Sequence, residues 1–189
     1  MSKLHINFRT DYDHYSGCPL APIELIQYGD FQCAYCAETY LVIKILQECF
    51  GDLLKFVFRH YPMPNHYPLS LQAAIASEAA ALQGKFWYMH DMIYENQKYL
   101  TRSSFSEFAR EIDLDTEAFE DCRYHRKLAR KVISDFEGGV KSGVNSSPTF
   151  FLNGARYDGL DDFDSLYLAI RNANHFEYGT EDRSVRLFR

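Results

Sequence analysis

The sequence predicts an α/β fold in which a strand–helix–strand unit is separated from a β-hairpin and a closing helix by an all-helical segment. Short β-type runs flank a helical pattern near the N-terminus, only helical patterns occur over about residues 68–142, and strands resume after Gly143. The 189 residues are 47% hydrophobic and 16% aromatic, which is ample material for a packed core and unlike the composition of a disordered chain.

The first unit contains two cysteines between a strand and a helix. Residues 23–28 predict a strand, residues 37–50 predict a helix that ends at Gly51, and residues 53–59 predict a second strand. This order predicts a right-handed βαβ unit with the Cys33-Ala34-Tyr35-Cys36 segment at the start of its helix. One apolar stripe is expected on that helix: Leu41, Ile45, Leu46 and Cys49.

The middle of the chain predicts an inserted helical subdomain. Helical patterns cover residues 71–82, 86–100 and 129–140. Ser104 and Glu107 form a candidate capping box at the start of a further helix that contains Phe108 and Ile112.

The last part of the chain predicts a hairpin and a helix. Residues 149–152 and 155–157 are β-prone and flank Asn153-Gly154, a dipeptide typical of a type I′ turn. Residues 160–170 predict a closing helix. We therefore expect one domain over residues 1–189, with a core at about 20–62 and 143–174, an insertion at about 68–142 and a polar tail at about 175–189.

The Cys-x-x-Cys spacing favours redox chemistry. On the first turn of a helix it brings two sulfurs within bonding distance and places Cys33 at the positive end of the helix dipole, which favours its thiolate. Cys33 would attack a partner disulfide and Cys36 would resolve the mixed disulfide, or the pair would donate its own disulfide to a substrate.

A zinc site is the main alternative for this pair. A structural zinc ion needs further clustered nitrogen or sulfur ligands, and the nearest candidates, Cys18, Cys49 and His60, form no second pair. Cys49 and Cys122 fit small buried hydrophobic positions, whereas Cys18 is the expected exposed thiol. The histidines show no i, i+4 pairing, so no metal site is predicted.

The charge and hydropathy patterns disfavour two classes of partner. A net charge of −6 argues against nucleic acids, and no apolar run is long enough to span a membrane. The N-terminal segment lacks the apolar stretch of a secretory signal. A cytoplasmic protein is expected from the chain as given, or a periplasmic one if a leader has been removed.

Four motifs, in order over about residues 14–172, resemble those of the DsbA-like thioredoxin-fold oxidoreductases. They are YGDFQCAYC (28–36), FVFRHYP (56–62), GKFWYMHD (84–91) and GVNSSPTFFLNG (143–154). The resemblance implies a thioredoxin-like core with a helical insertion, a nucleophilic Cys33, a resolving Cys36 and a cis-proline loop at Ser147-Pro148 that faces them. It also implies protein or peptide thiols and disulfides as substrates, a redox partner such as glutathione or a thioredoxin-type system, and no bound cofactor.

Two positions depart from the family pattern. Gln27 stands where relatives often carry a buried acid that relays a proton to the resolving thiol, and an amide cannot do this. Asp30 or a water molecule must then accept the proton, or disulfide exchange must be slower than in relatives. We expect that replacing Gln27 with glutamate would speed the resolution of the mixed disulfide at Cys33. Tyr35 stands where strongly oxidising members have histidine, which predicts a less depressed Cys33 pKa.

The direction of the reaction stays open at this level. An oxidase, a reductase and an isomerase would use the same Cys pair. Two further interpretations also remain. One is a glutathione-transferase-type enzyme on the same core, although the presence of both cysteines argues against it. The other is a non-catalytic redox sensor or zinc-holding module.

Overall fold

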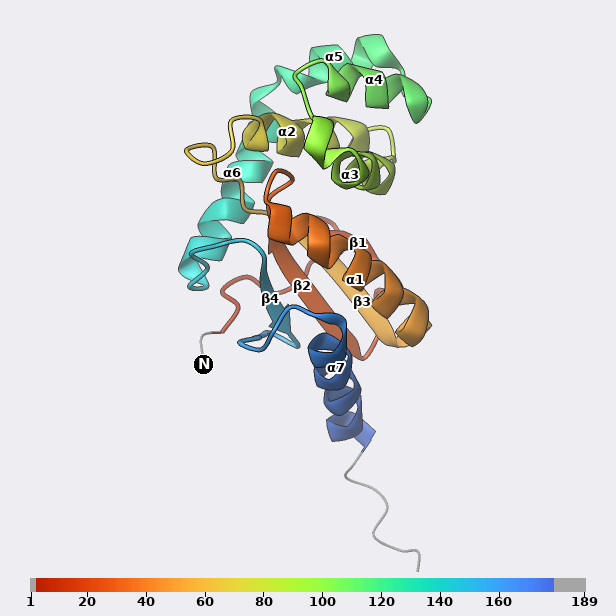
Figure 1. The fold of residues 1–189 in the computed structure, drawn as a ribbon, viewed down its shortest axis with the longest axis vertical. Coiled ribbons are helices and arrows are strands. Elements are labelled where there is room, and N and C mark those ends of the chain that lie inside the picture. Colours follow the sequence, from red (N-terminus) through yellow and green to blue (C-terminus); the bar gives the residue numbers. More distant parts are fainter. Residues whose placement is uncertain (1–2, 179–189) are drawn as a thin grey trace, which may run out of the picture.

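The computed structural model describes residues 3–178, which form a mixed five-stranded sheet covered by helices on both faces (Figure 1). The strand order is β1-β3-β2-β4-β5. The strands are β1 (His14–Ser16), β2 (Ile23–Gly29), β3 (Leu54–His60), β4 (Thr149–Leu152) and β5 (Ala155–Arg156). The helices are α1 (Ala34–Phe50), α2 (Ser70–Ala81), α3 (Phe86–Glu95), α4 (Ser104–Glu111), α5 (Thr116–Arg123), α6 (Arg126–Lys141) and α7 (Phe163–Tyr178).

The strand pairing confirms the predicted βαβ unit and hairpin. Strands β2 and β3 are parallel and joined through α1, while β4 pairs antiparallel with β2 and with β5. Asn153 and Gly154 have φ values of 46° and 76°, as the predicted turn requires. Strand β1, which pairs antiparallel with β3, has only three residues and no alternating pattern long enough to predict it.

Alternate residues of β2 face two different apolar clusters. Ile23 and Leu25 pack into the larger cluster beneath α1, α7 and the helical insertion. Ile26 and Tyr28 face the smaller cluster, which is covered by the N-terminal segment and by Phe136 of α6. Gln27 lies two residues after Leu25 in β2, so its side chain points to the same face of the sheet, which α1 covers.

The buried face of α1 differs from the predicted stripe. Of the four stripe residues only Leu46 is buried, whereas Leu41, Ile45 and Cys49 are exposed. The residues that α1 buries are Cys36, Thr39, Tyr40, Ile43 and Leu46. The prediction was wrong because the polar groups of Thr39 and Tyr40 find partners in the fold, so these side chains take the inward positions.

The segment between β3 and β4 contains five α-helices, α2 to α6, which lie at the upper end and along one side of the sheet in Figure 1. Helix α5 was not predicted. The predicted capping box does not form. Ser104 is the first residue of α4, and its hydroxyl accepts a hydrogen bond from the backbone N–H of Thr101 instead. Helix α3 ends at Glu95, and a 3-10 turn at Gln97–Tyr99 replaces the rest of the predicted helix.

The closing helix begins three residues later than predicted and runs to Tyr178. The first residues of the predicted tail therefore belong to α7, and the rest of that tail, 179–189, lies outside the described residues. Within the described residues, no helix has both the length and the apolar character needed to cross a membrane.

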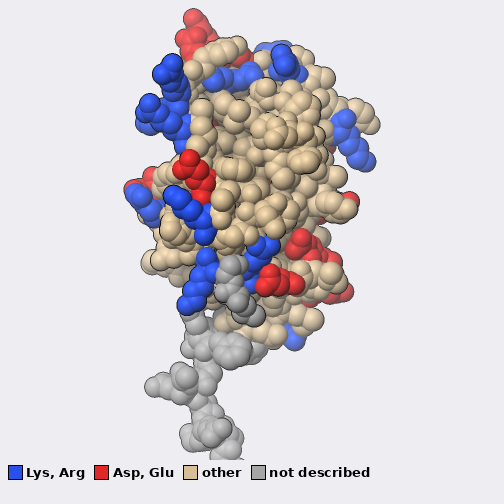
Figure 2. Space-filling view, turned by 90° about the vertical axis from the view of Figure 1, so that its left-hand side faces the viewer, with Lys and Arg blue, Asp and Glu red and all other residues tan. Residues whose placement is uncertain are grey.

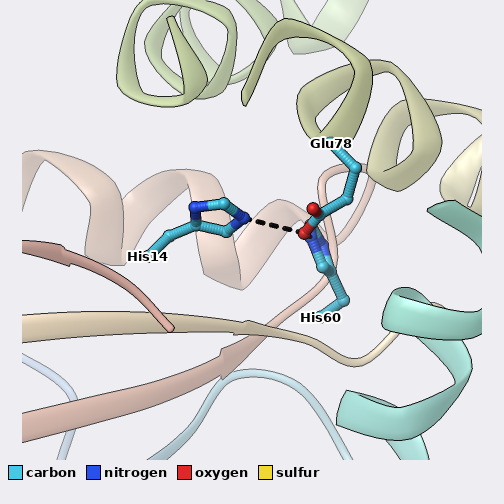
Figure 3. A group of neighbouring side chains, drawn as sticks. All are labelled: His14, His60 and Glu78. Carbon is cyan, nitrogen blue, oxygen red and sulfur yellow. Dashed lines mark hydrogen bonds and ion pairs between the residues drawn. The ribbon is translucent and has the colours of Figure 1, made fainter. Parts of the chain in front are cut away.

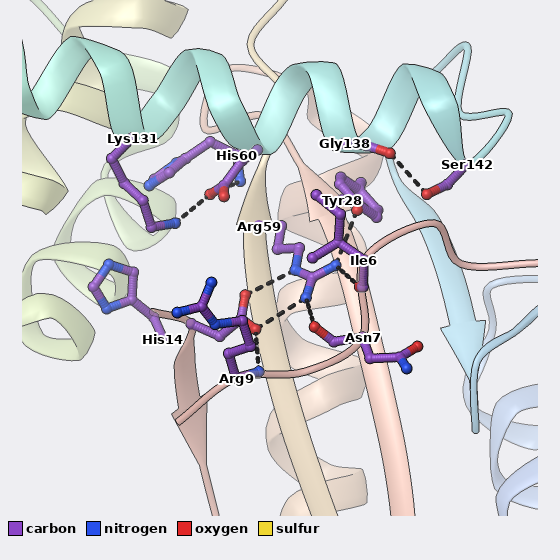
Figure 4. Close-up of polar contacts among 12 residues, drawn as sticks. Ile6, Asn7, Arg9, His14, Tyr28, Arg59, His60, Lys131, Gly138 and Ser142 are labelled. Atoms are coloured by element: carbon purple, nitrogen blue, oxygen red, sulfur yellow. Dashed lines mark hydrogen bonds and ion pairs between the residues drawn. The ribbon is translucent and has the colours of Figure 1, made fainter. Parts of the chain in front are cut away.

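A buried ion pair anchors the N-terminal segment to β3 (Figure 4). Arg59 donates from Nε and Nη2 to the two carboxylate oxygens of Asp13, at 2.8 and 2.9 Å. Its other donors reach the carbonyls of Ile6 and Asn7 and the hydroxyl of Tyr28, so all five guanidinium N–H groups have partners. The carboxylate also accepts the backbone N–H of Arg9.

The charged side chains are spread unevenly over the surface. On the face shown in Figure 2, acidic and basic side chains lie mainly along the edges, and a broad central area contains no Lys, Arg, Asp or Glu.

Candidate active site

Cys33 occupies the N-cap of α1, as its position in the sequence predicted. Its backbone is extended, with φ −71° and ψ 122°, and the helix begins at Ala34. The amide of Gln97 donates to the Cys33 carbonyl at 2.9 Å, which ties this turn to the helical insertion. The sulfur therefore lies at the end of the helix where unpaired backbone N–H groups favour a negative charge.

Cys36 lies one turn further along α1 and is fully buried. Its Sγ accepts the backbone N–H of Asp30 at 3.5 Å. Both thiols are free, and the two residues between them, Ala34 and Tyr35, are exposed. Cys33 is buried as well; it faces the loops at the end of the sheet, and Cys36 lies behind it.

The two thiols have opposite pKa shifts. The hydrogen bond from the Cys36 thiol is the largest cause that lowers the pKa of Cys33 to about 6, and the Tyr67 hydroxyl adds to this lowering against the effect of burial. Burial is the largest cause that raises the pKa of Cys36, and the charge on Cys33 raises it further. Near neutral pH the pair therefore holds one thiolate, on Cys33, and one thiol, on Cys36.

The loop before β4 lies against Cys33. The Ser147–Pro148 peptide bond is cis, and Cys33 Sγ lies 3.3 Å from the carbonyl oxygen of Ser147. The Ser147 hydroxyl is buried without a partner among the described residues. Beside this loop is a groove of about 620 Å³, which is lined by Tyr35, Glu38, Thr39, Val42, Ser146, Ser147, Pro148, Asp161, Asp162 and Phe163.

Asp30 and Gln27 both lie near Cys36 but play different parts. Burial raises the pKa of Asp30, whose carboxylate accepts the backbone N–H groups of Gln32 and Met63, each at 2.8 Å. Gln27 donates to the Thr39 hydroxyl at 3.4 Å, and that hydroxyl donates to the Cys36 carbonyl. Asp30 thus orders the loops around the cysteines, while Gln27 supports the first turn of α1.

The structure adds residues that sequence reasoning missed. Tyr67, Tyr94 and Gln97 come from the helical insertion and its leading loop. The Tyr67 hydroxyl favours the Cys33 thiolate, and the Tyr94 hydroxyl donates to the Asp30 carbonyl at 3.4 Å. Because no local pattern links these positions to the Cys pair, only the tertiary fold identifies them.

The candidate zinc ligands do not converge on the Cys pair. Cys49 lies 13 residues after Cys36 on the same helix, and a rise of about 1.5 Å per residue separates them by about 20 Å. Cys49 is exposed and Cys18 is half-buried, the reverse of the expectation for these two thiols. In the described part of the chain, His60 lies in a separate cluster that contains no cysteine.

Titration of Cys33 tests this electrostatic description. Thiolate absorbance of the reduced protein should rise with a midpoint near pH 6. Because the Cys36 thiol is the largest cause of the shift, Cys36→Ala should move this midpoint upward. A midpoint near the ordinary thiol value of about 8.5 in the unchanged protein would contradict the assignment.

The same shift predicts how stability depends on pH. The native Cys33 ionises near pH 6, whereas the unfolded thiol ionises at about 8.5. The reduced protein should therefore gain stability relative to Cys33→Ser as pH rises between these values, and lose it as pH falls through 6. Urea denaturation of both proteins at several pH values measures this difference.

A family model described as thioredoxin matches residues 9–172. The chain belongs to the thioredoxin family. Its fold is that of the DsbA-like members, as the sequence predicted. BdbD from Bacillus subtilis superimposes with a TM-score of 0.78 at 20% identity, over 92% of this chain and 98% of that one. The α-DsbA1 protein of Wolbachia pipientis gives a TM-score of 0.80 at 20% identity, over 90% and 94% of the two chains.

Curated relatives extend well beyond the matched region. A Na⁺/H⁺ antiporter NhaA 1 of Mycolicibacterium vanbaalenii is 40% identical over 162 residues, which is 85% of this chain and 26% of that protein. Another NhaA 1, of Salinispora arenicola, is 35% identical over 163 residues, 86% of this chain and 25% of that protein. The chain thus spans about a quarter of the length of these relatives. Family and fold together support thiol-disulfide exchange chemistry in general.

Proposed function

We propose that this chain exchanges disulfides with protein or peptide substrates through Cys33 and Cys36. The observation that carries the proposal is the geometry of the pair: Cys33 lies at the N-cap of α1 against the cis-proline loop, and Cys36 is buried one turn behind it. The lowered pKa of Cys33 and the raised pKa of Cys36 agree with this arrangement. A thiolate is the attacking species in disulfide exchange, and a pKa near ambient pH combines a high thiolate fraction with good nucleophilicity.

In the reducing direction, the Cys33 thiolate attacks one sulfur of a substrate disulfide. A Cys33–substrate disulfide forms, and the other substrate sulfur leaves as a thiolate that takes up a proton. Cys36 then loses its proton and attacks Cys33 Sγ, which releases the second substrate thiolate and forms the Cys33–Cys36 disulfide. The substrate gains two electrons, and the reverse sequence oxidises a substrate dithiol.

The environment of Cys36 changes during this cycle. Part of the rise in its pKa comes from the charge of Cys33 and from the hydrogen bond between the two sulfurs. Both contributions disappear once Cys33 is bonded to substrate, so Cys36 becomes easier to ionise when it must attack. Water, rather than the amide of Gln27, is the proposed acceptor of its proton.

The substrate lies along the groove beside the cis-proline loop. An extended chain could pair with the backbone of Ser147, which lies next to Cys33, and place its sulfur at Cys33 Sγ. Tyr35, Pro148 and Phe163 offer apolar contacts along the groove. This arrangement suits a peptide segment in extended conformation better than a small rigid molecule.

The redox poise of the compartment sets the net direction. A cytoplasmic glutathione or thioredoxin-type system would keep the pair reduced, and the protein would then act as a reductase or isomerase. An oxidising compartment would reverse the flow of electrons.

The test is catalysis in both directions. The reduced protein should speed the reduction of insulin by a thiol reductant, and a mixed redox buffer should let it speed the refolding of a scrambled disulfide protein. Alkylation of Cys33 should abolish both activities. If the unmodified protein showed no acceleration in either assay, the proposal would be rejected.

A further inference from the structure

Three side chains from distant parts of the sequence meet above β3 (Figure 3). His14 comes from β1, His60 is the last residue of β3, and Glu78 lies on α2. The Nε2 atoms of His14 and His60 lie 2.9 and 2.8 Å from Oε1 of Glu78. The three candidate ligand atoms all lie within 4.8 Å of one another.

Packing holds these side chains in place. The ring of His14 stacks on Phe86 with ring centroids 3.6 Å apart, and Phe58 packs edge-on against His60. His60 and Glu78 are buried, while 18% of the His14 side chain is exposed, which leaves one side open to solvent. A donor set fixed by its surroundings binds an ion without ordering flexible side chains first.

Two carboxylates share one ammonium group beside the cluster. Lys131 lies 3.9 Å from Oε1 of Glu78 and 2.6 Å from Oδ2 of Asp135. Both carboxylates lie in a largely buried region, where their charges interact strongly with nearby cations. The Oδ1 atom of Asp135 and the Nδ1 atom of His60 are also buried without partners among the described residues. A divalent ion beside Glu78 would be attracted by these two carboxylates.

We propose that His14, His60 and Glu78 bind a divalent transition-metal ion of the zinc class. Two imidazole nitrogens and one carboxylate oxygen form a donor set that Zn²⁺ accepts, with a water molecule in the fourth position. Ligands about 2.1 Å from a tetrahedral ion lie about 3.4 Å apart, so each Nε2 must move roughly half an ångström away from Oε1. This proposal is independent of the proposed disulfide exchange.

Metal binding would change the tautomers of the two histidines. Each now donates its Nε2 proton to Glu78, and each would have to carry that proton on Nδ1 instead. For His60 this leaves a buried N–H without a partner, a cost that the metal–ligand bonds must exceed. Lys131 can keep its contact with Asp135 while the ion takes its place beside Glu78.

The ion would link the sheet to the helical insertion. His14 and His60 belong to neighbouring strands, and Glu78 belongs to the first helix of the insertion. No spacing rule reveals this set, because each ligand comes from a different element. The expected consequence is a higher melting temperature for the metal-loaded protein.

The experiment must separate this site from the thiols. The Cys33→Ser/Cys36→Ser variant of the 189-residue chain, treated with a chelator and dialysed, is titrated with CoCl₂ and followed by visible absorption. One equivalent should bind with d–d bands of a four-coordinate nitrogen and oxygen site and without thiolate charge-transfer bands. ZnCl₂ should displace the cobalt and raise the melting temperature.

Ligand variants locate the bound ion. Glu78→Gln and His14→Asn in the same background should each weaken binding at least about tenfold, since even neighbours of ligands change affinity by that much. His125→Asn, which alters an exposed histidine outside the cluster, should bind like the parent. Long-range ¹H–¹⁵N spectra of the parent should show zinc-induced shifts at Nε2 of His14 and His60, whether or not the variants fold.

Three outcomes would overturn the proposal. They are no binding at one equivalent, binding with thiolate bands, and histidine shifts confined to residues outside the cluster. Any of these would leave the cluster as a hydrogen-bonded contact between β1, β3 and α2.

Discussion

Replacing Cys36 with alanine is expected to turn the protein into a trap for its substrates. The Cys33 thiolate would still attack a substrate disulfide, but no second thiol would release the product. Mixed disulfides should accumulate with a stoichiometry approaching one per chain, and insulin reduction should fall by on the order of 100-fold or more. Cys33→Ser should lose the same activity without forming adducts, because its hydroxyl is not a nucleophile toward disulfides.

Non-reducing gels and intact-mass measurements after a quench with acid would count the adducts. Cys49→Ser is the matched control, since Cys49 is an exposed thiol at the far end of the same helix and should leave turnover unchanged. Adducts that persist in Cys33→Ser would mean that another thiol attacks the substrate. Full turnover in Cys36→Ala would mean that the substrate itself resolves the mixed disulfide.

The parts of this site that the sequence predicted are local ones. The Cys33-x-x-Cys36 spacing, the strand before it and the helix after it lie within a few turns of chain, so backbone propensity and periodicity place both sulfurs at a helix N-terminus. The Asn153-Gly154 turn was predicted for the same reason, because its conformation depends on two adjacent residues.

The parts that it did not predict depend on contacts between distant segments. Tyr67 and Gln97 reach Cys33 only because the insertion folds back over α1. The apolar stripe predicted for α1 was incorrect for a related reason. Thr39 appears polar in isolation, yet it is buried because Gln27 lies opposite it and supplies a hydrogen bond. A pattern that counts apolar residues along one helix cannot see such a partner.

The largest loss of stability is expected from breaking the Arg59–Asp13 ion pair. Only 2% of the Arg59 side chain and none of the Asp13 side chain is exposed, so neither charge can be hydrated if its partner is removed. Arg59→Met keeps much of the side-chain volume but removes both guanidinium donors from the Asp13 carboxylate, which keeps only the backbone N–H of Arg9, and leaves two backbone carbonyls without donors. Removing one partner of a buried pair costs about 3–5 kcal/mol, a large share of a domain stability of about 5–15 kcal/mol.

Urea denaturation of Arg59→Met, Asp13→Leu and the double variant would separate the pair from its surroundings. Each single variant leaves one buried charge without its ion-pair partner. The double variant removes both charges and should regain part of the lost unfolding free energy. Asp11→Ala breaks the neighbouring but exposed Arg9–Asp11 pair and should change stability little. If Arg59→Met were as mild as Asp11→Ala, the N-terminal segment would not depend on Arg59, and its backbone contacts alone would hold it against β3.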